Sequence, residues 1–259
     1  MNCAKKLFVG GNWKCNNTLK ESRTVIDKVL SKLKFDGDKV DVVVFPPTIH
    51  IQDTIANSSN KSILIGSQNI NTRPFGAFTG ETSYLHLSDF GVKWTLVGHS
   101  ERRSIFGESD EEVASKTKFA LENKFNVVVC VGESLTERES NLTLDVIDRQ
   151  LQEVNKQIAD KQLWKDIVIA YEPVWAIGTG KVASPEQAQE VHKWVRSWLS
   201  NLFGEEGSNA TRIIYGGSVT DKNCKELIEQ ADIDGFLVGG ASLKPAFVDI
   251  VGCVDKAAE

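Results

Sequence analysis

The sequence predicts an α/β fold, a single (β/α)8 barrel over residues 1–259 with eight parallel strands ringed by helices. Short and nearly continuous apolar runs recur along the whole chain, which is typical of strands buried on both faces of a parallel sheet. Segments with helical periodicity separate most of these runs, and they are long enough for the crossovers that parallel pairing needs. Because no Pro-, Gly- or Ser-rich linker divides the chain, a two-domain arrangement is disfavoured.

The expected strands are apolar and β-branched, and they occupy residues 7–9, 40–45, 63–65, 94–97, 127–131, 167–171, 212–215 and 235–238. The helices between them show apolar faces at spacings of three and four residues, for example Val191, Trp194, Val195, Trp198 and Leu199. Ser184, Pro185 and Gln187 form a helix-start sequence, with Ser as the N-cap and Pro at the first helical position. The polar tail, residues 255–259, is expected to fray.

Composition excludes several classes of protein. The chain has 30 basic and 35 acidic residues, and this acidic balance disfavours a nucleic-acid partner. No apolar run approaches the ~20 residues that span a bilayer, and the basic-then-apolar start is too short for a secretory signal. The five cysteines are scattered without a Cys-x-x-Cys pair, so we expect free thiols, a cytoplasmic location and no metal site.

Polar and titratable residues follow the expected strands, at 11–14, 66–69, 98–102, 130–133, 171–175, 215–218 and 238–242. In a (β/α)8 barrel the carboxyl ends of the strands form one rim, and that rim holds the active site. The last two loops of this rim often bind phosphate. The sequence therefore predicts an active site at the carboxyl rim.

Two glycine-rich segments indicate phosphate binding. Gly216-Gly217-Ser218 follows the seventh expected strand, and Gly239-Gly240 follows the eighth. Exposed backbone N–H groups at such turns form an anion cradle. Tight turns alone would explain one glycine pair. Two pairs at the two expected loops, together with Lys14, favour phosphate.

Glu172 and His99 are the candidate catalytic residues. Glu172 ends a buried strand among mostly apolar neighbours, and partial desolvation makes a carboxylate a stronger base. The alternative is a solvated loop acid. His99 is one of four histidines, and a single histidine is more often structural. Its position directly after a buried strand, before Ser-Glu-Arg-Arg, favours catalysis.

Three other motifs fail on inspection. Residues 178–183 spell G-x-G-x-x-A, but several residues separate them from the strand and the required downstream acid is missing. Gly98-His-Ser100-Glu-Arg102 lacks the final glycine of a nucleophile elbow. Lys181 precedes Val182 instead of Ser or Thr, so it does not belong to a nucleotide-binding P-loop.

Six segments together closely resemble the triosephosphate isomerase family. They are residues 12–14 (Asn-Trp-Lys), 76–81, 98–103, 170–181, 215–218 and 234–240, and they span the chain from the first strand to the last. The resemblance implies a TIM barrel that interconverts dihydroxyacetone phosphate and D-glyceraldehyde 3-phosphate through an enediolate. It also implies that no cofactor is needed, and that the reaction is a step of glycolysis and gluconeogenesis.

The resemblance also implies residue roles. Glu172 is the base, His99 polarises the carbonyl group, Lys14 stabilises the developing negative charge, and Asn12 orients the substrate. Backbone N–H groups at Gly178, Ser218, Gly239 and Gly240 hold the phosphate. The lid is residues 173–181, namely Pro173, Val174, Trp175, Ala176, Ile177, Gly178, Thr179, Gly180 and Lys181. Ile177 and Leu237 close over Glu172, Tyr215 latches the closed lid on Ala183, and Ser100 and Glu101 support the site.

The family's homodimer implies a role for two loops. The third loop, residues 71–81 with Thr79 near its tip, inserts beside the first loop of the partner subunit. This loop carries Phe78, and apolar residues at a loop tip are costly to leave in water; the alternative is a loop folded back on its own barrel. Cys15 is expected to line the receiving pocket, and Cys130 to be buried and slow to react.

The chain departs from the family at two places. Asn17 stands where the family usually has Gly, and Asn tolerates a positive φ, so the turn is expected to survive. Thr82-Ser83-Tyr84 replaces the usual Ile-Ser-Pro, so the following helix is expected to start differently. Two other functions stay open: a catalytically silent phosphosugar-binding barrel, and a barrel aldolase with Lys14 as its Schiff-base lysine.

Overall fold

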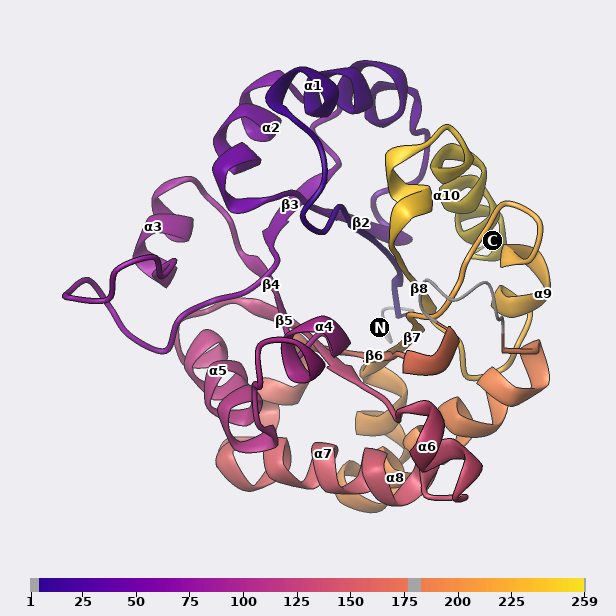
Figure 1. Cartoon of the computed structure of the whole chain (residues 1–259). Coiled ribbons are helices and arrows are strands. Elements are labelled where there is room, and N and C mark those ends of the chain that lie inside the picture. Colours follow the sequence, from indigo (N-terminus) through magenta and orange to yellow (C-terminus); the bar gives the residue numbers. More distant parts are fainter. Residues whose placement is uncertain (1–4, 177–182, 259) are drawn as a thin grey trace.

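The computed structural model describes residues 5–176 and 183–258. Within them, parallel strands run in the order β1 to β8 and close into a barrel because β1 pairs with β8 (Figure 1). The predicted fold class is confirmed. The strands are β1 Leu7–Asn12, β2 Val40–Phe45, β3 Leu64–Ser67, β4 Trp94–Val97, β5 Asn126–Val131, β6 Ile167–Tyr171, β7 Arg212–Tyr215 and β8 Gly235–Val238.

The first strand extends beyond its predicted end. Glycines weaken strands, which is why the sequence predicts an end at residue 9. In the barrel, Gly10 and Gly11 continue the ladder opposite Val43 and Val44 of β2. A Cβ atom on Gly10 would lie 2.8 Å from Cδ1 of Leu237, so the crowded barrel interior has no room for a side chain there. Tertiary packing therefore overrides the local preference.

Helices surround the barrel on its outer face (Figure 1). The α-helices are α1 Leu19–Lys28, α2 Ile51–Asn57, α3 Tyr84–Asp89, α4 Ser100–Ser104, α5 Asp110–Glu122, α6 Leu135–Glu139, α7 Thr143–Gln157, α8 Pro185–Ala210, α9 Cys224–Ile228 and α10 Ala246–Ala257. Short 3-10 helices are η1 Leu30–Lys32, η2 Thr48–His50, η3 Lys161–Asp166, η4 Val174–Ala176 and η5 Gly240–Leu243. None of the described helices is long and apolar enough to cross a membrane.

Helix α8 begins where the sequence predicts it. The Ser184 hydroxyl caps this helix by accepting the backbone N–H of Gln187. The predicted frayed tail is wrong for residues 255–257, because α10 continues through Ala257. Val254 of this helix is fully buried, and the Asp255 carboxylate accepts the backbone N–H of Asp36 at 2.8 Å. These contacts hold the last turn of α10 on the barrel.

The barrel interior is filled with side chains. Its residues form one cluster: Phe8, Val43, Phe45, Trp94, Leu96, Val128, Cys130, Val168, Ala170, Ile214 and Leu237. A larger apolar cluster packs between the strands and the helices. Because the interior is a packed core, polar chemistry is confined to the rims.

Both departures from the family pattern are accommodated. Asn17 has a φ of +73°, in the left-handed region that Asn tolerates better than most residues. Helix α3 begins after Ser83, whose hydroxyl accepts the backbone N–H of Leu85. The ring of His86 in turn accepts the Ser83 backbone N–H at 3.2 Å, which completes a capping box.

Candidate active site

One cavity of about 490 Å³ opens at the carboxyl rim. The catalytic and phosphate-binding residues predicted from the sequence and described by the structure line it together: Asn12, Lys14, His99, Glu172, Ser218, Gly239 and Gly240. Leu237 lines the same cavity next to Glu172. Residues from five different strand ends therefore converge on one space, which the closure of the barrel makes possible.

The Glu172 carboxylate is almost completely removed from solvent, with 2% of the residue exposed. Its Oε2 accepts the backbone N–H of Ser100 at 2.9 Å, and its Oε1 lies 3.1 Å from Nε2 of His99. Gly216 makes room for this side chain, because a Cβ atom there would lie 2.9 Å from Cγ of Glu172. The predicted desolvation of Glu172 is thus present, and hydrogen bonds compensate for it.

The thiol of Cys130 lies in the barrel interior near Glu172. Cys130 is completely buried, as predicted. Burial, and next the nearby Glu172 charge, raise the pKa of the Cys130 thiol well above its usual value. Cys130 therefore keeps its proton beside the Glu172 carboxylate.

The imidazole of His99 is held at the start of α4. Gly98 turns the chain out of β4 with a φ of +70°, a conformation that favours glycine. The Nδ1 atom of His99 accepts the backbone N–H of Glu101 at 3.2 Å. A backbone N–H can only donate, so the neutral ring carries its proton on Nε2. This Nε2–H points toward Glu172 and the cavity, ready to donate to a carbonyl oxygen.

Lys14 occupies a strained backbone conformation, with a φ of +53°. Its backbone N–H donates to Oδ1 of Asn12 at 2.9 Å, and its carbonyl accepts Nε2 of Gln68 at 2.8 Å. Its ammonium pairs with the Glu101 carboxylate at 2.6 Å. These contacts fix both ends of the residue, so its charge is positioned before substrate arrives. Gln68 follows β3 at the rim, and a polar residue at a strand end was the only signal for it.

The two glycine-rich segments form loops on the same side of the cavity. The side chain of Asn223 donates to the carbonyl of Ser218 at 2.9 Å and so shapes the β7 loop. The Ser242 hydroxyl donates to the carbonyl of Gly239 at 2.7 Å. Lys14 reaches the β8 loop, since a Cβ atom on Gly239 would lie 3.5 Å from Cε of Lys14. A cation beside two glycine-rich loops that line one cavity suits a phosphate group.

The start of the predicted lid rests on a buried acid. Pro173, Val174, Trp175 and Ala176 lead into and form η4, whereas Ile177, Gly178, Thr179, Gly180 and Lys181 lie outside the described residues. The indole N–H of Trp175 donates to Oε1 of Glu133 at 2.9 Å, and the Tyr171 hydroxyl donates to the same atom at 3.2 Å. Glu133 is fully buried. It lies just beyond the end of β5, as Glu172 lies just beyond the end of β6, yet no role was predicted for it.

The Tyr215 phenol lies near Ala183, which follows the predicted lid in the chain. Burial raises the pKa of Tyr215 to about 12, and the backbone of Ala183 opposes part of that rise. A Cβ atom on Gly217 would lie 2.2 Å from this phenol oxygen, so glycine is required beside it. The latch of Tyr215 on Ala183 that the resemblance implies stays a prediction.

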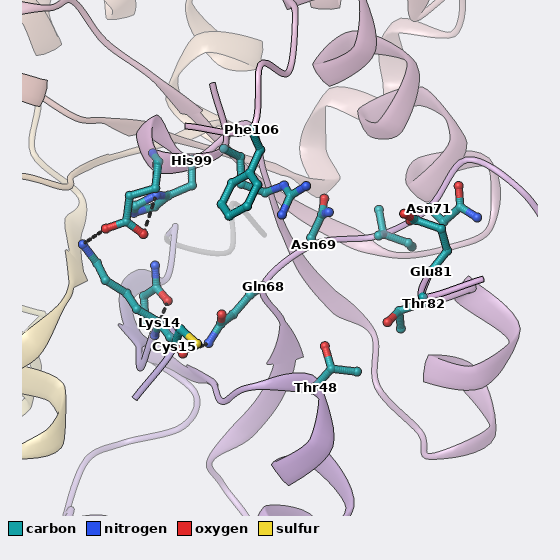
Figure 2. A pocket seen from close by; sticks show the side chains of 15 residues that line it. Lys14, Cys15, Thr48, Gln68, Asn69, Asn71, Glu81, Thr82, His99 and Phe106 are labelled. Atoms are coloured by element: carbon teal, nitrogen blue, oxygen red, sulfur yellow. Dashed lines mark hydrogen bonds and ion pairs between the residues drawn. The ribbon is translucent and has the colours of Figure 1, made fainter. Parts of the chain in front are cut away.

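A second cavity, of about 340 Å³, adjoins the site and is lined by Cys15, Gln68, Asn71 and Phe106 among others (Figure 2). Cys15 is exposed on its wall. The loop that carries Phe78 and Thr79 lies between β3 and α3 and projects away from the barrel (Figure 1). Phe78 is 39% exposed, so the loop does not bury its apolar tip against its own barrel.

A (β/α)8 barrel that carries a buried carboxylate beside an imidazole at its carboxyl rim fits the class of isomerases that move a proton next to a carbonyl group. Comparison with known proteins identifies the family within this class. The family model for triosephosphate isomerase matches residues 7–254.

Curated triosephosphate isomerases resemble the chain over nearly their whole length. The Emericella nidulans protein is 54% identical, and the match covers 95% of this chain and 98% of that protein. The Candida albicans protein is 50% identical over 96% of this chain and 98% of that protein. An Oryza sativa protein named as cytosolic is 48% identical over 95% of this chain and 96% of that protein. The chain belongs to the triosephosphate isomerase family, and its function is the isomerisation of triose phosphates.

Proposed function

We propose that Glu172, His99, Lys14 and Asn12 carry out the isomerisation of dihydroxyacetone phosphate and D-glyceraldehyde 3-phosphate. The observation that carries this assignment is the contact between the Glu172 carboxylate and the His99 Nε2–H inside the rim cavity. Removing a proton beside a carbonyl group requires a base, and the oxygen that gains charge requires a donor. These two groups, placed on one cavity, supply both.

The reaction begins when the substrate carbonyl oxygen accepts a hydrogen bond from the Nε2–H of His99. Glu172 then removes a proton from carbon 1 and returns it to carbon 2. The hydroxyl proton on oxygen 1 passes to oxygen 2, which leaves an aldehyde at carbon 1 and a hydroxyl group at carbon 2. The negative charge that develops on the enediolate oxygen is stabilised by the His99 donor and the Lys14 ammonium. The side chain of Asn12 fixes the backbone of Lys14 and borders the same oxygen. The substrate phosphate binds the backbone N–H groups of Ser218, Gly239 and Gly240, together with Gly178 of the lid.

The lid protects the intermediate. An enediol phosphate eliminates phosphate when water reaches it, so the cavity must stay closed until the proton returns. Residues 173–181 close over the site, with Ile177 and Leu237 covering Glu172. The contact of Trp175 with Glu133 anchors the start of this segment, and Tyr215 latches its end on Ala183 when the lid closes.

The working form is a homodimer in the cytoplasm. The exposed loop with Phe78 and Thr79 inserts into the partner's cavity beside Cys15, which accounts for apolar side chains at a loop tip. Free cysteines and a relative named as cytosolic support a reducing location.

A coupled assay for glyceraldehyde 3-phosphate tests the assignment against a silent phosphosugar-binding barrel. We expect rapid turnover from dihydroxyacetone phosphate without added metal or cofactor. Binding of substrate analogues without turnover would favour the silent barrel. Borohydride trapping with substrate tests the aldolase alternative. We expect no adduct, because the Lys14 ammonium is paired with Glu101 and an ammonium is not a nucleophile.

A further inference from the structure

Two cysteines that the proposed mechanism does not use lie together behind the phosphate loops. Cys224 is the first residue of α9, and Cys253 lies in the second half of α10. The two helices pack against each other, side by side at the outer face of the barrel (Figure 1). Cys224 belongs to the apolar layer between strands and helices, and Cys253 packs against that layer.

The two thiols are neighbours in this layer but differ in exposure. The Cys253 side chain is near enough to contribute to the raised pKa of Cys224, whose thiol donates to the carbonyl of Asp221 at 3.7 Å. Cys224 is 2% exposed. Cys253 is partly exposed and lines a surface cleft of about 590 Å³ between the helices, which is also lined by Lys225 and Lys256. A small oxidant can therefore reach Cys253 first.

We propose that Cys224 and Cys253 form a redox-active dithiol, which peroxide converts into a disulfide between α9 and α10. The Cys253 thiolate attacks one peroxide oxygen and breaks the O–O bond, which gives a sulfenic acid and hydroxide. The sulfur of Cys224 then attacks the sulfenic sulfur and expels hydroxide, and the protons released by the two thiols convert both hydroxides into water. Two thiols and one hydrogen peroxide thus give one disulfide and two waters.

The order of the two steps follows from burial. Desolvation, and next the neighbouring Cys253 thiol, raise the pKa of Cys224 to about 12. Cys224 is therefore protonated at neutral pH, and it acts as the resolving thiol and not as the one that meets peroxide. The second step is slower than the first at neutral pH, because it needs a thiolate at the buried position.

The disulfide acts on the phosphate loops, and this part of the proposal rests on the proposed function. An S–S bond is about 2.05 Å long, shorter than any non-bonded contact between sulfur atoms, so oxidation must draw α9 and α10 together. It also removes the Cys224 proton that binds the Asp221 carbonyl. The preceding residue, Asn223, holds the Ser218 carbonyl at 2.9 Å and the Thr220 backbone N–H at 2.7 Å. Movement of α9 therefore displaces the loop that binds phosphate.

The test treats the native protein with millimolar hydrogen peroxide and follows mass, non-reducing peptide maps and kinetics on the same samples. We expect a loss of two hydrogens, a cross-linked peptide joining Cys224 to Cys253, and reversal by dithiothreitol. Loss of one hydrogen bond to the phosphate raises the KM for dihydroxyacetone phosphate by about tenfold, with a smaller change in kcat. The Cys253→Ser variant keeps the basal KM and loses the response.

Three outcomes decide the proposal. Peroxide that adds oxygen to Cys253 without forming the cross-linked peptide overturns the dithiol. A quantitative cross-link with an unchanged KM overturns the link to the phosphate loop. A Cys253→Ser variant whose KM still rises with peroxide assigns the response to another thiol and overturns the proposal. The cross-link is measured by mass, so a protein that formed it but isomerised no triose phosphate would refute the proposed function alone.

Discussion

The Nε2 atom of His99 lies 3.1 Å from Oε1 of Glu172, so the proposed base and the proposed electrophile contact each other directly. The ring is held from its other side by the backbone N–H of Glu101. A substrate carbonyl oxygen must therefore replace the carboxylate as the acceptor of the Nε2–H. This exchange frees Glu172 to face the carbon atom whose proton it removes, while the imidazole stays where the helix start has fixed it.

Substitution of Glu172 by Gln tests the base. Glutamine keeps the size of the side chain but cannot take the proton, so kcat should fall by a factor of ~10²–10⁴ or more. The affinity for a substrate analogue should change much less, because the phosphate loops and Lys14 are intact. Steady-state kinetics and analogue titration measure the two effects. Glu172→Asp is the matched control, since it keeps a carboxylate at a shorter reach and should retain more activity than Gln. Near-normal turnover in the Gln variant would refute the assignment.

Most of the barrel could be predicted from local sequence because each strand is a short apolar run. The runs at 94–97 and 167–171 agree with β4 and β6 to the residue, since both strands are buried on two faces. The end of β1 could not be predicted, because Gly10 and Gly11 are strand residues only through their pairing with β2. The tail at 255–257 looked polar, and its helical state depends on contacts with residues far away in sequence.

The residues of the site also divide into those that the sequence predicts and those that only the structure reveals. Glu172, His99 and Lys14 follow strands directly, so a barrel topology is enough to bring them to one rim. The residues that support them are recognisable only in space. Gln68 binds the carbonyl of Lys14 across 54 positions of sequence, and Glu133 accepts the indole of Trp175 across 42. Such partners depend on the register between neighbouring strands, which apolar periodicity does not specify.

Deletion of Ile177–Thr179 tests the lid. The deletion removes residues that cover the intermediate but leaves the barrel, so the protein should fold and still form the enediol phosphate. Water then reaches the intermediate, and methylglyoxal and phosphate should be released in place of much of the isomerised product. Partitioning is measured by assaying both products from one reaction. Full-length protein under the same conditions is the control, and the same partitioning in the deletion would contradict a protective role.

His192 should make the free energy of unfolding depend on pH. Its Nδ1–H donates to the carbonyl of Asp232, and its Nε2 is buried without a partner among the described residues. Burial therefore lowers the pKa of His192 from 6.5 to about 4, with Asp232 and Asp234 opposing the change and Arg196 adding to it. The unfolded chain binds this proton below pH 6.5 and the folded chain does not. The contribution of the neutral His192 to the free energy of unfolding is therefore complete above pH 6.5, and it is lost as pH falls from 6.5 to about 4.

The variant His192→Asn isolates this effect, because the Asn amide can replace the Nδ1–H donor but does not titrate. A pKa difference of about 2.5 corresponds to a free energy of about 3 kcal/mol, which sets the upper size of the effect. Urea unfolding at fixed protein concentration, from pH 4 to pH 7, measures both proteins. We expect the wild-type advantage to shrink as pH falls. A constant difference across this range would contradict a neutral buried imidazole.

Cys15 links assembly to activity. It is exposed on the wall of the cavity beside Lys14 (Figure 2). A single chain leaves Phe75 and Phe78 of the projecting loop 61% and 39% exposed. If the partner's loop fills this cavity, a bulky thiol adduct on Cys15 overfills it, and overpacking costs ~1–3 kcal/mol or more. Labelling of Cys15 should therefore dissociate the dimer and abolish activity together. Sedimentation and activity, measured on the same labelled sample, follow both.

The Cys15→Ser variant is the matched control, because it keeps a small side chain on the cavity wall and should resist the reagent. Cys130 is buried and keeps its proton, so it should react too slowly to account for the loss. Activity should be lost on dissociation, because Lys14 has a strained backbone directly before Cys15 and the partner's loop would confine that segment. A fully labelled Cys15 in an intact and active dimer would refute this placement. An active monomer at assay concentration would refute it as well, since a single chain would then hold Lys14 in position unaided.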